Sequence, residues 1–338
     1  MSLLQNTTVV SLTFVLTGIP GLESAHTWVS IPFCFLYAIA ISGNSMILFI
    51  IITNQSLHEP MYYLLSMLSA TDMCLSLSTM PTTLGVFCLN IQKIGWNACI
   101  SQMFFIHFLT VMESSVLLAM AFDRYIAICN PLRYVTILTP TKIIQIGLMI
   151  VGRGTLFMTP LLLLLKRLSF CRDNILSHSY CYHPDVIKCS CSSIRVNSIY
   201  GLFALLSTFG LDAPLIGLSY VLIIHSVLNI ASPEERNKAF STCISHIGAV
   251  TIFYIPLIGL SAVHRWGKKA PPVVHTMMSD AFLLLPPVLN PVIYSVKTKQ
   301  IRRAIIKLLS TAMVVHVSPL FSSYTTMMIP LPQPHTSQ

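Results

Sequence analysis

The sequence predicts an all-α membrane protein, a bundle of seven transmembrane helices followed by a short amphipathic interfacial helix. Of the 338 residues, 54% are hydrophobic and only 9% are charged, whereas a soluble domain carries roughly 25% charged residues. Apolar runs along the chain repeatedly exceed the ~18 to 20 residues that cross a bilayer core. These observations exclude a water-soluble globular protein.

Seven runs with few or no charges are long enough to span a bilayer. Because lipid offers no hydrogen-bond partners, such spans must be helices or a closed barrel, and runs of this length favour helices. The two halves of the chain do not echo each other as they do in many transporters, which weakens a transporter interpretation. The predicted spans are 29–53, 62–87, 99–128, 143–165, 199–228, 240–263 and 273–296.

The remaining segments flank this bundle, which occupies residues 29–296. We expect residues 1–28 to form an N-terminal tail and residues 310–338, rich in Pro, Ser and Thr, to be disordered. In residues 297–309, apolar side chains recur at helical spacing opposite Lys and Arg, which is typical of a helix lying on the inner leaflet. The net charge of +9 comes mainly from residues beside the spans and does not indicate a nucleic-acid partner.

The positive-inside rule does not decide the orientation of the bundle. With the N-terminus outside, the outer segments hold nine Lys and Arg and the inner segments hold ten. Asn6 begins the glycosylation sequon Asn6-Thr7-Thr8 in a tail without Lys or Arg, and cysteines are concentrated in the outer segments of this orientation. Both features favour a multi-pass protein of the plasma membrane with its N-terminus outside the cell.

Five of the ten cysteines fall in the predicted outer segments, where an oxidising exterior permits disulfides. A bridge from the long loop at 166–197 back to Cys99 would hold that loop over the mouth of the bundle. Spacing alone does not determine the pairing, and an odd number leaves one thiol, assigned to Cys189, that is free or pairs elsewhere, for example with Cys88. The residues expected in disulfides are Cys99, Cys171, Cys181 and Cys191.

Several motifs carry a resemblance to a known family. MAFDRYIAICNPLRY at 120–134 and NPVIY at 290–294 resemble the DRY and NPxxY motifs of class A G protein-coupled receptors. Together with LHEPMYYLLSMLSATD at 57–72, Ser219-Tyr220 and KAFSTCISH at 238–246, they resemble olfactory receptors. GIPGLE at 18–23, VHRWG at 263–267 and TKQIR at 298–302 resemble the class I, fish-like branch. The resemblance covers roughly residues 10 to 309.

The resemblance implies an odorant receptor that activates a stimulatory, olfactory-type heterotrimeric G protein and raises cAMP. Asp123 can hold Arg124 by a charge-assisted hydrogen bond, although Arg124 reaching toward lipid headgroups is the alternative. Pro291 lets the last span bend, either as part of the switch or as a static kink. The residues assigned to activation and G-protein coupling are Asp123, Arg124, Tyr125, Tyr220, Lys238, His246, Asn290, Pro291 and Tyr294.

Charged groups inside the membrane need partners. By resemblance, Asp72 matches the position where class A receptors hold a sodium ion, and Glu113 would lie close to it. The two carboxylates bind Na⁺, share a proton or water network, or pair separately. No other cofactor is expected. We expect Arg153 to pair with one of the remaining acids, Asp212 or Asp280, in a structural role.

A ligand site is expected near the outer ends of the spans. His107 lies about 12 Å below the start of the third span and shares one helical face with Met103 and Thr110, unless it is a satisfied interior histidine. Arg265 follows Ser261 by four residues, and its guanidinium suits a carboxylate unless it is only an exposed charge at the end of a loop.

By resemblance to class I receptors, the ligand is a small volatile with a carboxylic acid or similarly polar head. Pro184 replaces a polar amide that some acid-recognising relatives place three residues after the middle loop cysteine, so Tyr182 or His183 would substitute for it. The side chains expected to form the apolar wall are Met158, Leu161, Phe203, Leu206 and Ile258.

Other functions fit the sequence less well. An enzyme would need a nucleophile and a base that converge, or a metal cluster, and the sequence indicates neither. A retinal pigment would need a lysine inside the last predicted span, and residues 273–296 contain no lysine. A zinc site at His178, Cys181, His183 and Cys189 is less favoured than disulfides. An ion channel or carrier lined by acidic residues and a receptor for an endogenous metabolite outside the olfactory epithelium are the alternatives that stay open.

Overall fold

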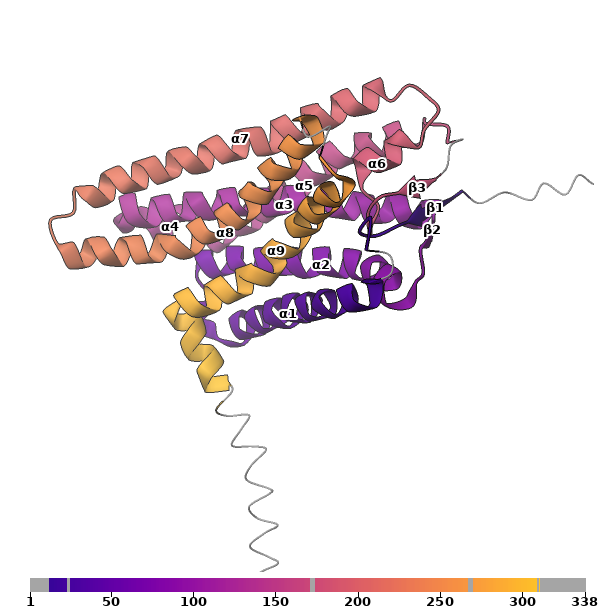
Figure 1. Cartoon of the computed structure of the whole chain (residues 1–338). Coiled ribbons are helices and arrows are strands. Elements are labelled where there is room, and N and C mark those ends of the chain that lie inside the picture. The colour runs from indigo at the N-terminus through magenta and orange to yellow at the C-terminus, as the bar shows by residue number, and fades with distance from the viewer. Residues whose placement is uncertain (1–11, 23–24, 171–173, 267–269, 309, 311–338) are drawn as a thin grey trace, which may run out of the picture.

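The computed structural model describes residues 12–22, 25–170, 174–266, 270–308 and 310, without the side chains of residues 238, 242 and 264–266. Asn6, Cys171 and nearly all of the C-terminal tail therefore lie outside the described residues. Within the described ranges, seven helices are long and apolar enough to cross a membrane, which confirms the predicted number of spans (Figure 1). They are α1 (His26–Thr53), α2 (Pro60–Leu89), α3 (Trp96–Cys129), α5 (Pro140–Leu165), α7 (Arg195–Leu228), α8 (Pro233–Trp266) and α9 (Pro272–Lys297).

Local sequence explains where several of these helices begin. Pro60, Pro140 and Pro272 each occupy the first helical position of α2, α5 and α9, where the missing N–H has no intrahelical partner to lose. Thr139 also accepts a hydrogen bond from the backbone N–H of Lys142 and caps α5. Short helices fill the connections: η2 (Gln55–Leu57), η3 (Pro131–Arg133), α4 (Tyr134–Ile137) and α6 (His183–Lys188).

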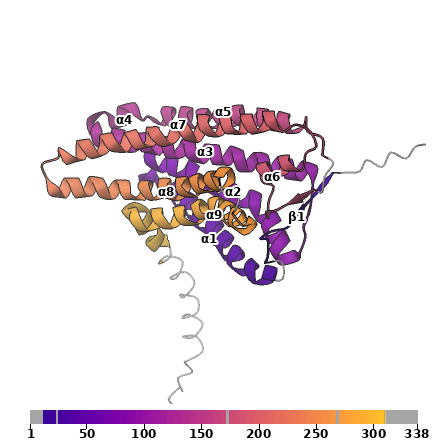
Figure 2. The same cartoon turned by 45° about the horizontal axis from the view of Figure 1, so that its top comes forward.

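A small three-stranded sheet covers one end of the bundle, which we call the strand end (Figure 2). Strand β1 (Thr13–Leu16) lies between antiparallel β2 (Lys93–Gly95) and parallel β3 (Ile175–Leu176). The segment that we expected to form an N-terminal tail thus contains a strand at Thr13–Leu16. The Phe14 side chain of β1 is fully buried, so this strand is packed onto the bundle.

The disulfide between Cys99 and Cys181 ties the start of α3 to the long loop, as the predicted loop anchor requires. Because the sulfur of Cys181 is oxidised in this disulfide, it cannot also be a thiolate ligand of the zinc site considered above. Cys191 is disulfide-bonded as well, whereas Cys189 is a buried free thiol. Burial raises the pKa of the Cys189 thiol, which keeps it protonated and unreactive.

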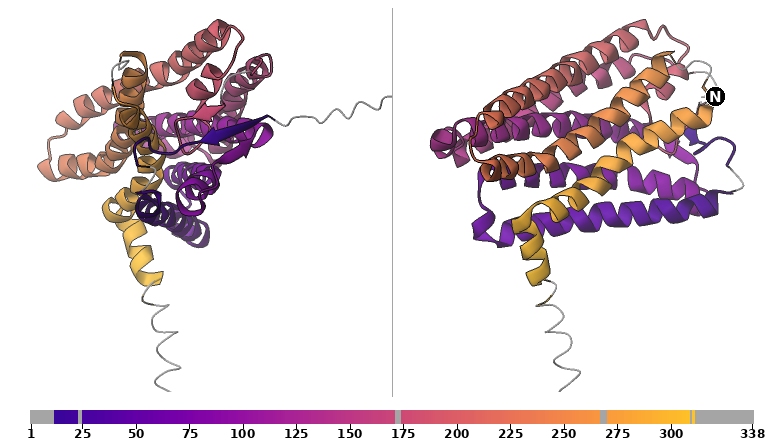
Figure 3. Two further views of the ribbon diagram at one scale, coloured as in Figure 1. Left: turned by 45° about the vertical axis from the view of Figure 1, so that its right-hand side comes forward. Right: turned by 60° about the vertical axis from the view of Figure 1, so that its left-hand side comes forward.

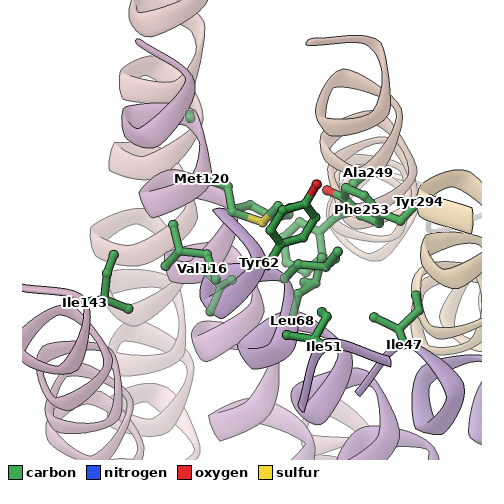
Figure 4. Packing of buried hydrophobic residues seen from close by; sticks show 14 of the residues in the cluster. Ile47, Ile51, Tyr62, Leu68, Val116, Met120, Ile143, Ala249, Phe253 and Tyr294 are labelled. Carbon is green, nitrogen blue, oxygen red and sulfur yellow. The ribbon is translucent and has the colours of Figure 1, made fainter. Parts of the chain in front are cut away.

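The largest hydrophobic core fills the opposite half of the bundle. Tyr62, Met120, Phe253 and Tyr294 converge there from four helices (Figure 4). Many large apolar side chains on the outer faces of the helices are exposed, as a lipid-facing surface requires. Helix α9 passes beside α1 (Figure 3). It is followed by a helix at residues 299–308, whose Ile301 side chain is completely buried against the largest hydrophobic core.

Candidate functional site

A cavity of about 420 Å³ lies between α3, α5, α7, α8 and α9 toward the strand end, with α6 above it. The volume suits a small organic molecule. The structure places five of the predicted binding residues in its wall: His107, Thr110, Met158, Leu161 and Ser261. Further lining residues include Tyr182, His183, Asn197, Ala204, Leu205, Thr208, Phe209, Leu257 and Phe282.

Two polar side chains that face this cavity stand out. The ring of His107 on α3 meets the ring of His183 on α6 edge to face, with centroids 5.9 Å apart. Asn197, in the first turn of α7, is 3% exposed, and its Nδ2 donor has no hydrogen-bond partner among the described residues. A buried donor without a partner costs free energy until a ligand or a water accepts its hydrogen bond.

Asn197 escaped the sequence analysis because α7 begins at Arg195, one turn before the predicted span at 199–228. The apolar run starts only after Asn197, which places this residue in the loop when hydropathy alone is considered. A signal was present nevertheless. A polar residue within one helical turn of a span can still point into the bundle.

Four of the predicted binding residues do not line the cavity. Phe203 and Leu206 on α7 and Ile258 on α8 are 53%, 55% and 62% exposed and do not line this cavity, contrary to the expectation for them. The lining residues of α7 lie at 197, 198, 201, 202, 204, 205, 208 and 209, and the helix turns positions 203 and 206 away from that face. Met103 is fully buried, but it packs beneath the sheet with Cys99 and Cys181 instead of lining the cavity.

Arg265 belongs to α8, one turn beyond Ser261. Its side chain lies outside the described part of the chain, so the anion clamp stays a prediction.

A polar network forms the floor of the cavity. Asp212, one turn beyond Thr208 on α7, accepts hydrogen bonds from Ser114 (2.6 Å) and Arg153 (2.9 Å). Ser114 is also 2.9 Å from the Tyr254 hydroxyl. The guanidinium of Arg153 additionally donates to Ser115 and to the Thr208 carbonyl. The expected ion pair of Arg153 with a remaining acid is confirmed, and it links α3, α5, α7 and α8.

Two carboxylates lie deeper in the bundle. Asp72 on α2 accepts a hydrogen bond of 2.9 Å from the amide of Asn290 on α9. Glu113 on α3 is buried as well and interacts electrostatically with Asp72. One oxygen of each carboxylate has no partner among the described residues. The described residues contain no group of three or more His, Cys, Asp and Glu side chains that could hold a metal ion.

The latch that the sequence predicts is formed at the end of α3, which we call the latch end. The Nη2 of Arg124 lies 2.7 Å from the Asp123 carboxylate, and both side chains are buried. The hydroxyl of Tyr134, on α4, donates to the other oxygen of Asp123 at 2.8 Å. Arg124 is thus held inside the bundle and does not extend toward the headgroups.

Other predicted switch residues lie around this ion pair. Tyr220 on α7 hydrogen-bonds to Nδ1 of His246 on α8, whose Nε2 lies 3.0 Å from the Leu117 carbonyl of α3. The Tyr294 hydroxyl is buried without a partner among the described residues. Tyr125 packs against the neighbouring apolar core, and Pro291 contacts α1 where Gly43 leaves no room for a Cβ atom. The Lys238 side chain lies outside the described residues.

The loop above the cavity is held by a charged cluster. His178 Nδ1 lies 2.6 Å from one oxygen of Asp185, and Lys188 donates to the other at 3.0 Å. Burial by itself would raise the pKa of Asp185, but the hydrogen bond and charge of His178 and the nearby Lys188 hold it well below its usual range. The carboxylate therefore stays ionised and fixes the loop over the cavity.

This combination of seven helices, a cavity near one end and a buried arginine latch at the other defines a rhodopsin-like seven-helix fold. The structure is similar to that of squid rhodopsin, with a TM-score of 0.71, 17% sequence identity and 88% of both chains covered. At that identity the likeness shows the fold alone.

The sequence comparisons are more specific. The olfactory receptor family model matches residues 33–312. Human olfactory receptor 51F1 is 63% identical over 311 residues, covering 92% of this chain and 98% of that protein. Human olfactory receptor 51F2 is 63% identical over 309 residues, covering 91% and 90%, and rat olfactory receptor 51E2 is 54% identical over 294 residues, covering 87% and 92%.

The chain belongs to the olfactory receptor family. It is a multi-pass plasma-membrane receptor and not an enzyme, and it belongs to a family whose partners are small-molecule ligands and G proteins. The resemblance to the class I branch agrees with its olfactory receptor 51 relatives.

Proposed function

We propose that this receptor binds a small volatile with a carboxylic acid or similarly polar head in the cavity beneath α6. The observation that carries this proposal is the buried, unpartnered Nδ2 donor of Asn197 in a cavity lined mostly by apolar side chains. His107 adds a second polar group, and Met158, Leu161 and Leu257 supply apolar contacts for a short hydrocarbon chain. Such a combination favours a ligand with one polar end.

The strand end faces the outside of the cell in this proposal. The Cys99–Cys181 disulfide at that end requires an oxidising compartment, and the sequon at Asn6 precedes β1. The latch end then faces the cytosol, where Arg124 would meet a stimulatory, olfactory-type G protein that raises cAMP. Ligand binding shifts the equilibrium between the latched arrangement and an open one.

The experiment is a cAMP reporter assay in cells that express the receptor, with straight-chain aliphatic acids compared with alcohols of equal length. We expect acids to be more potent than alcohols. Asn197→Leu should lower the potency of the best acid roughly tenfold, since a hydrogen bond to a charged group contributes about 1.5–3 kcal/mol. Arg265→Ala should remove the preference for acids over alcohols.

Phe203→Leu provides a matched control, because Phe203 lies near Asn197 along α7 but faces away from the cavity. Its response should equal that of the parent receptor at equal surface expression. Equal potency of acids and alcohols, or an unchanged acid response in both Asn197→Leu and Arg265→Ala, would contradict the proposed ligand class.

We infer that Asp72 and Glu113 hold a sodium ion. The carboxylate oxygens without partners fit a hard cation, because Na⁺ prefers oxygen ligands and would offset two buried negative charges. When bound, the ion would supply positive charge between α2 and α3, and Asn290 would keep Asp72 oriented.

The melting temperature of the purified receptor tests the sodium site without requiring an agonist. It should rise when choline chloride is replaced by NaCl at equal ionic strength, and the rise should disappear in Asp72→Asn and Glu113→Gln. A melting temperature that depends on pH but not on Na⁺ would instead support a shared proton.

A further inference from the structure

Two free cysteines meet at the strand end of the bundle. The Sγ atoms of Cys34 on α1 and Cys88 on α2 are 3.8 Å apart, and both side chains are exposed at the protein surface. A disulfide requires the sulfur atoms to approach to about 2.05 Å. Forming the bond therefore requires the two side chains to rotate toward each other.

The contact follows from packing that does not involve the thiols. Phe33 and Phe87, which immediately precede the two cysteines, stack with ring centroids 5.0 Å apart and an interplanar angle of 19°. Both phenylalanines are buried, so the stack fixes the register of α1 against α2. Because each cysteine follows its phenylalanine by one residue, the same register sets Cys34 beside Cys88.

The position of the pair favours oxidation. Cys88 is the penultimate residue of α2, and after Leu89 the chain turns through left-handed Asn90 (φ 53°) toward strand β2. This is the end of the bundle that carries the Cys99–Cys181 disulfide. If that end is outside, as proposed above, both pairs mature in the same oxidising compartment.

We propose that Cys34 and Cys88 form a further disulfide that links α1 to α2. The oxidant is a small-molecule disulfide such as oxidised glutathione. One cysteine thiolate attacks a glutathione sulfur and releases one glutathione, and the second cysteine then displaces the other glutathione from the mixed disulfide. Two protein thiols are oxidised, one glutathione disulfide is reduced, and the two protons end on the released glutathione thiols.

The bridge would act on a helix that contacts α9 at two of its internal prolines. The Asn44 side chain of α1 donates to the Pro287 carbonyl at 2.8 Å, and a Cβ atom on Gly43 would lie only 2.9 Å from Pro291. A disulfide near the start of α1 would restrict the movement of α1 relative to α2. The contacts of Asn44 and Gly43, farther along α1, would still hold α9 in place. The disulfide therefore stabilises the assembled bundle without entering the ligand cavity.

Peptide mapping of the full-length receptor tests the proposal. Receptor from cells lysed in N-ethylmaleimide is digested without reductant, and mass spectrometry should find Cys34 and Cys88 in one cross-linked species. If the Cys99–Cys181 species is present and both Cys34 and Cys88 carry maleimide, this proposal is wrong while the orientation stands. If the Cys99–Cys181 species is absent as well, both the Cys34–Cys88 disulfide and the proposed orientation of the bundle are wrong.

Single substitutions provide an independent test. In Cys88→Ser, Cys34 should change from unlabelled to fully labelled by a maleimide, whereas Cys74→Ser, which removes another exposed thiol of α2, should leave Cys34 unlabelled. Cys34→Ser and Cys88→Ser should lower the melting temperature equally, and the double variant should lower it no further. Additive losses, or labelling of Cys34 in the parent receptor, would overturn the proposal.

Discussion

The buried ion pair between Arg153 and Asp212 provides the sharpest test of the cavity floor. Replacing Arg153 by Met removes the positive charge but keeps a long apolar side chain between α5 and α7. Among the described residues, the Asp212 carboxylate, whose side chain is 3% exposed, would then keep Ser114 as its one hydrogen-bond donor. An uncompensated carboxylate would remain inside the membrane-spanning bundle.

The magnitude follows from the burial of the two partners. Removing one member of a buried ion pair costs about 3–5 kcal/mol. The Arg153 side chain is 24% exposed, so we expect a loss near the lower end, about 3 kcal/mol. With a shift of about 2–4 °C per kcal/mol, the melting temperature should fall by roughly 6–12 °C.

A double-mutant cycle distinguishes charge from packing. Asp212→Asn keeps an acceptor for Ser114 but removes the negative charge, so Arg153→Met with Asp212→Asn should melt above Arg153→Met alone. The measurement is the melting temperature of purified receptor in detergent, with Leu156→Met on the exposed face of α5 as the control. If the double variant melts at or below the temperature of Arg153→Met, the unpaired charge of Asp212 is not the cause of the destabilisation.

Three further predictions concern the latch, the loop and the cavity. Arg124→Ala should reach the cell surface but abolish ligand-evoked cAMP, and normal signalling at equal surface expression would contradict the latch. Asp185→Asn should lower the melting temperature at pH 7. Because the pKa of Asp185 is depressed in the folded state, its stabilisation is fully present above the unfolded value of about 4 and is lost progressively as the pH falls from there through the folded value, so the difference between parent and variant should narrow steadily as the pH is lowered below about 4. A difference that does not narrow as the pH is lowered would show that the ionised carboxylate is not its source. Ala204→Phe should fill the cavity and raise the effective agonist concentration at least tenfold without lowering the melting temperature, as a dose–response series would show. Retained potency would place the ligand elsewhere.

Hydropathy predicts the spans of this protein better than their ends. All seven were identified because a lipid-crossing segment must be continuously apolar over its length. Helix α8 nevertheless begins at Pro233, seven residues before the predicted start, with Glu234 and Glu235 in its first turn. Acidic side chains stabilise the N-terminus of a helix but give no hydropathy signal.

The rotation of each helix about its axis is harder to predict. In a soluble protein the apolar face is the buried face, but here both lipid and core are apolar, so Phe203 and Ile258 gave no sign that they face outward. Polar residues such as His107 and Thr110 were placed correctly in the cavity wall because lipid excludes them. The sheet could not be predicted, since its strands of two to four residues come from distant segments.

The cavity and the latch are joined by groups spaced along a single face of α3. Thr110 lines the cavity, Ser114 bonds to the floor network, and the Leu117 carbonyl is bound by His246 of α8. An outward movement of α8 at the latch end would break the contact of His246 with α3 and strain its hydrogen bond to Tyr220 of α7. Each such bond contributes about 1 kcal/mol, so a ligand needs to favour the open arrangement by only a few kcal/mol to change its population substantially. Contacts made by one small molecule with α7 and α8 in the cavity wall can supply that difference, because α7 carries Tyr220 and α8 carries His246, the two partners of that hydrogen bond.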